Sequence, residues 1–217
     1  MRNIKGLSYF AFFIFMLDNY KTDCSPVNMC AGSRERNNVF QMTVSETVED
    51  AIPRLLQKFQ LFLRNLGDFI DTLKERGLRG DQHLLEAIGS SEGLDGFPVF
   101  NLQNVGEDID EQLIRDYQVL LNIWPFVEHM KKLEESSDRI SYSSVINDIY
   151  SYLQDLICEF YTVIVNRDRV IPSLQNPATV PLTYNELSAA SRHLYHFLLS
   201  RDMQKIVTLL RNGYADN

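Results

Sequence analysis

Four long stretches of this chain carry apolar side chains at helical spacing, and the connections between them limit how the stretches can be arranged. The apolar residues recur every three or four positions over about 48–73, 108–134, 144–166 and 183–212. The first and third connections are long, and the second is short. A short turn joins antiparallel neighbours, whereas parallel neighbours need a connection that runs back along a whole helix. The order long, short, long therefore predicts an all-α, up-up-down-down four-helix bundle.

Two prolines bear on the first two helices. Proline is tolerated best in the first turn of a helix, because it has no amide hydrogen to donate. The first helix therefore begins either at about Val48 or, with Pro53 in its first turn, near Asp50. Pro125 lies inside the second helix and is expected to kink it, since it removes one backbone hydrogen bond.

The fourth helix and the first connection carry further local signals. Thr183–Glu186 has the sequence of a capping box, which predicts that the fourth helix opens there. The apolar stripe of this helix changes phase at Ser200–Asp202, which indicates either a kink or two separate helices. In the first connection, about 77–107, His83–Ile88 is expected to form a short helix.

Residues 1–24 have the features of a secretory leader. Arg2 and Lys5 precede an apolar run at 7–17. A run of this length suits a signal peptide and is short for a membrane-spanning helix of about 20 residues. Cleavage after this leader would release one domain, 25–217, outside the cell. The alternative interpretations are an uncleaved anchor and a buried helix.

The number of cysteines left to pair depends on removal of the leader. Its removal takes Cys24 and leaves one pair of cysteines in an oxidising compartment. Cys158 lies on the third helix, away from the apolar stripe and on the same face as Asn147 and Ser151. An outward cysteine can meet the N-terminal tail, so the sequence predicts a disulfide between Cys30 and Cys158.

Composition and motifs give no sign of an enzyme. The net charge of −8 argues against nucleic-acid binding, which needs a basic surface. Gly89–Gly93 fits G-x-S-x-G, but a nucleophile elbow follows a strand, and no strand is predicted before it. His193 and His196 lie three residues apart without an acidic or cysteine third ligand, so we interpret them as packed or solvated histidines. We expect no catalytic residues, no metal site and no cofactor.

Two candidate partner surfaces stand out. On the first helix, Leu61 lies where the pattern otherwise places polar residues. A single exposed leucine is ordinary, but an apolar residue ringed by polar ones has the form of a binding anchor. An aromatic cluster at the end of the first connection either covers the bundle or adds to a second partner surface. The candidate residues are Gln57, Leu61, Arg64, Asp68 and Gln154 on the first surface, and Phe97, Phe100 and Tyr184 on the second.

With its helices placed, the chain resembles the interleukin-6 family of long-chain helical cytokines, especially the branch of leukaemia inhibitory factor, oncostatin M, ciliary neurotrophic factor and the cardiotrophin-like cytokines. Leu94–Pro98 is similar to the segment that precedes the second helix in the neurotrophic members. Cys30 and Cys158 are similar to the bridge from tail to third helix in the oncostatin-like members. Several members open the fourth helix with Phe-x-x-Lys, whereas Tyr184–Leu187 keeps the aromatic residue and lacks the lysine.

The resemblance implies a secreted, monomeric ligand that binds and dimerises class I cytokine receptors of the glycoprotein-130 type and so activates their associated kinases. It implies one site on the outer faces of the first and third helices, and another where the fourth helix starts beside the end of the first connection. It implies no cofactor, no nucleic acid and no membrane insertion after cleavage. The alternative functions are a secreted helical lipid-binding carrier and a leptin- or growth-hormone-like ligand of a different class I receptor.

Overall fold

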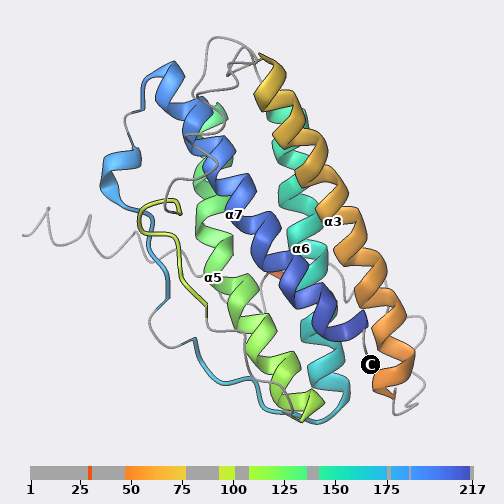
Figure 1. Ribbon diagram of the computed structural model, residues 1–217. Helices are drawn as coiled ribbons and strands as arrows, with labels where there is room; N and C mark the ends of the chain where they lie inside the picture. The colour runs from red at the N-terminus through yellow and green to blue at the C-terminus, as the bar shows by residue number, and fades with distance from the viewer. Residues whose placement is uncertain are drawn as a thin grey trace, which may run out of the picture. The chain divides into compact units, whose positions relative to one another are not determined.

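The computed structural model describes residues 29–30, 47–76, 93–100, 108–135, 142–174, 177–185 and 187–215. The chain divides into two units, 1–42 and 43–217, and within the first unit Met29 and Cys30 are described and are helical. The second unit contains α3 (Val48–Arg76), α5 (Ile109–Glu135), α6 (Ser143–Asn166), the 3-10 turn η1 (Leu182–Tyr184) and α7 (Ala189–Ala215) (Figure 1). The predicted leader, 1–24, and the predicted short helix His83–Ile88 lie outside the described residues. None of the helices in the described ranges is long and apolar enough to cross a lipid bilayer.

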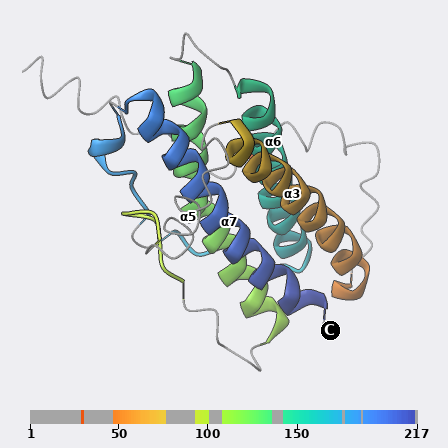
Figure 2. The ribbon, with the colours of Figure 1, turned by 45° about the horizontal axis from the view of Figure 1, so that its top comes forward.

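α3 runs antiparallel to both α6 and α7, against which it packs. The start of α3 meets the end of α6, where Arg54 Nε lies 2.8 Å from Glu159 Oε1. The start of α3 also meets the end of α7, where the ring centroids of Phe59 and Tyr214 are 6.0 Å apart. Figure 2 shows α3 alongside these two helices.

α5 is likewise antiparallel to α6 and α7. Asp110, in the first turn of α5, forms an ion pair with Arg167, directly after the end of α6. Gln112 Nε2 donates to the carbonyl oxygen of Gly213, at the end of α7, at 3.3 Å. α3 and α5 therefore run in one direction and α6 and α7 in the other (Figure 1). This confirms the predicted up-up-down-down bundle.

The first helix begins at Val48, because Thr47 caps it. The Asp50 amide donates to Thr47 Oγ1 at 3.3 Å, and the Thr47 hydroxyl donates to Asp50 Oδ2 at 2.8 Å. This reciprocal pair satisfies an amide that the helix itself leaves without a partner. The alternative start near Asp50 is therefore wrong, and Pro53 lies inside the helix. α5 likewise continues through Pro125.

The predicted capping box at Thr183 is wrong. Leu182–Tyr184 form a 3-10 turn, and α7 begins at Ala189. Ser188 is the N-cap: its Oγ accepts from the Ser191 amide at 3.2 Å. The hydroxyl of Ser188, five residues further on, therefore caps the helix in place of Thr183. α7 is one uninterrupted helix through Ser200–Asp202, so two separate helices are also excluded.

Aromatic side chains fill the space between the helices. The Phe59 ring meets the Phe160 ring edge-on at 5.8 Å between centroids, and Tyr214 packs on both. Each of these side chains is almost fully buried, and burial of a side chain of this size contributes roughly 2–3 kcal/mol. The other large side chains with almost no exposure include Phe62, Phe69, Tyr117 and Phe126.

His196 is a polar residue in this core. Neither of its ring nitrogens has a hydrogen-bond partner among the described residues, and the same holds for Ser200 Oγ one turn later. Phe69 of α3 packs beside the imidazole at 6.2 Å between centroids. Burial lowers the pKa of His196 to about 3, and His193, Arg192 and His129 add unfavourable positive charge. The imidazole is therefore neutral in the folded chain.

This pKa predicts acid sensitivity. An unfolded histidine takes up a proton as the pH falls through about 6.5, whereas folded His196 resists protonation until about 3. Between these values the unfolded state binds more protons, so stability falls with pH by up to about 1.4 kcal/mol per unit. In urea unfolding at pH 7.5, 6.0 and 5.0, His196→Leu should therefore lose less stability than the parent. Equal losses in the two proteins would show that His196 is not the residue responsible.

Candidate functional site

The first predicted surface lies on the outer line of α3. Gln57, Arg64 and Asp68 are exposed, and Leu61 between them is half-buried. The spacing of four, three and four residues places them along one side of the helix. The prediction that Leu61 interrupts a polar line is therefore correct. Gln154 is half-buried on α6.

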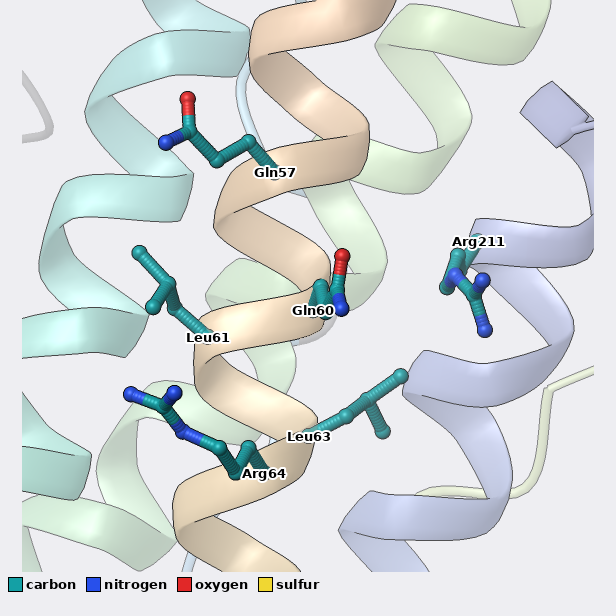
Figure 3. Close-up of a pocket in the computed structure, with 6 residues that line it drawn as sticks. All are labelled: Gln57, Gln60, Leu61, Leu63, Arg64 and Arg211. Atoms are coloured by element: carbon teal, nitrogen blue, oxygen red, sulfur yellow. The ribbon is translucent and has the colours of Figure 1, made fainter.

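A hollow of about 520 Å³ opens beside this line. It is lined by Gln57, Gln60, Leu61, Leu63, Arg64 and Arg211 (Figure 3). Three of these six residues were predicted from the sequence. Gln60 and Leu63 could have been predicted from the sequence, because they directly precede Leu61 and Arg64. Arg211 was not, because only the packing of α7 against α3 brings it there.

The cationic side chains on and beside α3 differ in whether a carboxylate lies near them. Glu159 on α6 lies 2.8 Å from the Arg54 guanidinium and 3.8 Å from Lys58 Nζ. In contrast, no carboxylate of the described residues lies within 4.0 Å of the Arg64 or Arg211 guanidinium. The hollow therefore has two cationic side chains that the rest of the described chain leaves unneutralised.

The second predicted surface is built on the segment 93–100, which lies against α7. The Leu94 amide donates to Asp202 Oδ2 at 2.7 Å, and Arg201 Nε donates to Asp202 Oδ1 at 2.8 Å. All three residues are buried. This contact accounts for the aspartate in the phase change at Ser200–Asp202, because Asp202 faces the covering segment instead of solvent.

The same segment meets the turn before α7. Gly96 has a φ of +73°, a backbone conformation that favours glycine. A Cβ atom at this position would also lie 2.5 Å from Pro181 Cγ, so there is no room for a side chain. The Tyr184 hydroxyl donates to the Asp95 carbonyl oxygen at 3.1 Å. The Tyr184 ring lies 4.8 Å from that of Tyr195. The end of the first connection thus lies against Tyr184 through Asp95.

The aromatic residues of the second surface have different surroundings. Phe97 packs edge-on against Phe126 of α5 at 5.1 Å, and Phe100 is half-buried. Burial and the nearby Asp95 carboxylate raise the pKa of Tyr184, which keeps its hydroxyl protonated as a donor. Within the described residues of 93–100 and η1, the exposed large apolar side chains are Val99 and Leu182, at 97% and 83% exposure. Val99 belongs to the apolar cluster predicted at the end of the first connection, whereas Leu182 was not predicted, because a single leucine in a turn has no periodic pattern to mark it.

Other residues singled out in the sequence have structural surroundings. His193 Nδ1 lies 2.7 Å from the Ala189 carbonyl oxygen, and its Nε2 lies 3.1 Å from the Tyr142 hydroxyl. With His196 buried, the two histidines do not form a shared metal site. Within the described ranges no group of three or more metal-ligating side chains occurs. The G-x-S-x-G stretch lies outside the described residues except for Gly93.

Cys30 and Cys158 are both disulfide-bonded, as the predicted pairing requires. On α6, Cys158 follows the exposed Ser151 and Asp155 at helical spacing and is itself buried. Cys158 therefore lies on the predicted outer face of α6, and its own side chain is buried.

Peptide mapping of the non-reduced protein should yield one disulfide-linked pair containing Cys30 and Cys158. Closure of a loop of this size would stabilise the fold by about 4–5 kcal/mol through the entropy of the unfolded chain. Cys30→Ser and Cys158→Ser should therefore destabilise equally. A linkage between Cys24 and Cys158 would contradict both the pairing and the expected cleavage point.

No protein-family model, curated protein or solved structure matches this chain in the three comparisons made.

The Asp202 contact predicts how the second surface is held. Asp202→Ala removes the acceptor for the Leu94 amide and breaks the ion pair with Arg201, which should cost about 2–4 kcal/mol. Limited proteolysis should then cut within 93–100 faster than in the parent. Asp155→Ala, at an exposed position on α6, is the control and should stay within about 0.5 kcal/mol of the parent. If the two variants behave alike, Asp202 does not anchor the segment.

Proposed function

We propose that this chain is a secreted helical cytokine that binds and dimerises class I cytokine receptors of the glycoprotein-130 type and so activates their associated kinases. The observation that carries the proposal is the up-up-down-down bundle. Its parallel pairs, α3 with α5 and α6 with α7, require long connections that a simple bundle does not need. The disulfide-bonded state of Cys30 and Cys158 supports an oxidising, extracellular location.

The two candidate surfaces support a ligand that joins two receptor chains. One surface lies on the outer side of α3, and the other is formed by 93–100 and η1 at the approach to α7. They share no residues. A ligand that dimerises receptors needs two surfaces of this kind, because each receptor chain must occupy its own.

The filled core favours a receptor ligand over a lipid carrier. A carrier must hold an acyl chain between its helices, whereas Phe59, Phe160 and Tyr214 occupy that space here. Opening the bundle would expose these rings at a cost of roughly 2–3 kcal/mol each. A leptin- or growth-hormone-like ligand would have the same architecture, so the receptor bound is what distinguishes it.

Surface plasmon resonance against a panel of class I receptor ectodomains tests the proposal. The secreted protein should bind a receptor of the glycoprotein-130 type. Binding of a different class I receptor would support the leptin- or growth-hormone-like alternative. No binding, together with lipid found in the purified protein by mass spectrometry, would support the carrier.

Leu61→Arg should abolish binding to one receptor chain and leave the other intact, since apolar anchors carry much of the binding energy of an interface. The matched control is Leu209→Arg, which places arginine at a 57% exposed leucine outside both surfaces. Circular dichroism should show the same helix content in both variants. If Leu61→Arg binds both chains like the control, α3 is not the contact surface.

A further inference from the structure

The hollow beside α3 is lined by positively charged side chains, whereas the chain as a whole is acidic. The chain has a net charge of −8, and several of its α3 cations are matched locally. Arg54 and Lys58 share Glu159, and Lys74 lies 2.9 Å from Asp71. Arg64 and Arg211 have no such carboxylate among the described residues. Asp68, one turn after Arg64, is exposed and not within ion-pair distance of it.

The six lining residues form two similar rows (Figure 3). Along α3, Gln57, Leu61 and Arg64 follow one another on the side toward α6. Gln60 and Leu63 lie on the side toward α7, where Arg211 completes the second row. Each row therefore combines an amide, a leucine and a guanidinium. The two leucines are half-buried, and Gln57, Gln60 and Arg64 are exposed.

We propose that this hollow binds a strip of a partner protein in which two carboxylates flank an apolar side chain. The inference rests on the proposed function, since the partner is taken to be a receptor ectodomain. Arg64 and Arg211 would each bind one carboxylate, and guanidinium groups suit this role because they donate two parallel hydrogen bonds. The Gln57 and Gln60 amides are further donors. Leu61 and Leu63 offer the apolar floor against which the flanked side chain packs.

The composition of the hollow favours a protein over other anions. Inorganic phosphate gains nothing from two leucines. A polyanion such as heparin is bound by a continuous basic stripe, whereas here two cations are separated by amides and leucines on an acidic chain. A peptide surface, unlike phosphate, heparin or a fatty acid with its single carboxylate, can place two carboxylates on either side of an aliphatic or aromatic side chain.

We expect the two arginines to affect mainly the rate of association and the choice of partner. Charged groups at the rim of an interface steer the encounter and are screened by salt. The parent should therefore lose association rate as sodium chloride rises from 50 to 500 mM. A double variant with neutral side chains, Arg64→Gln with Arg211→Gln, lacks both positive charges and should show little salt dependence.

The test uses the secreted protein and the receptor ectodomain that the panel identifies. Arg64→Glu and Arg211→Glu should each weaken binding about tenfold, and the double variant about a hundredfold, since each arginine meets its own carboxylate. Arg211→Gln removes the charge with less disturbance of a half-buried position and should weaken binding severalfold. Arg76→Glu, at an exposed arginine at the far end of the same helix, is the matched control. Circular dichroism checks that all variants fold.

Reversal of the partner's charges completes the test. Exposed carboxylates of the ectodomain are changed to lysine one at a time, and one such change should restore binding to Arg64→Glu and a different one to Arg211→Glu. If the parent binds a receptor and both arginine variants bind like Arg76→Glu, this inference is overturned while the proposed function stands. If the parent binds no class I ectodomain, both are overturned. Retention of the parent on heparin, lost in the arginine variants without any change in receptor binding, would assign the hollow to a polyanion and overturn the inference.

Discussion

The buried carboxylate of Asp202 ties the first long connection to the middle of α7. Because α3 and α5 are parallel, the connection between them must run back along the bundle. Such a long connection is held in place by contacts with the helices that it crosses. Asp202 supplies one such contact by accepting from the Leu94 amide at 2.7 Å and from Arg201. A buried carboxylate is tolerable only with such partners, since an unpaired one would cost several kcal/mol. The segment 93–100 and the surface built on it both depend on this contact.

At the end of α7, Tyr214 joins all four helices. Its ring packs on Phe59 of α3 and Phe160 of α6, and its hydroxyl donates to Asp116 Oδ2 of α5 at 2.9 Å. Burial raises the pKa of both Tyr214 and Asp116. The last turn of α7 is therefore held from three sides, and Arg211, one turn earlier, projects from a fixed backbone. In the proposed binding role, a side chain on such a fixed backbone would lose little freedom, which would favour affinity.

The helices could be predicted from the sequence, because each has an apolar stripe that the bundle buries, and the lengths of the connections determined their directions. The errors arose where a tertiary contact overrides a local pattern. Ser200–Asp202 suggested a break because the segment that pairs with Asp202 is remote in sequence. Thr183 was predicted as a cap because Thr183–Glu186 has the sequence of a capping box, but Ser188 accepts from the Ser191 amide and caps the helix instead. The half of the hollow on α3 follows from helical spacing, whereas Arg211 depends on how α7 packs, which no local pattern specifies.

The two candidate surfaces differ in how they are held, and this difference makes them separable. The α3 surface lies on a helix whose opposite side is buried among aromatic rings, so its side chains keep their spacing as long as the bundle is folded. The second surface depends on a few contacts outside the helices: Asp202 with Leu94, the Tyr184 hydroxyl with Asp95, and the close approach of Gly96 to Pro181. None of these contacts involves α3, so losing one should loosen the second surface while α3 stays folded. Changes in sequence can therefore alter one surface while the other is preserved, which is the independence that a ligand of two different receptor chains requires.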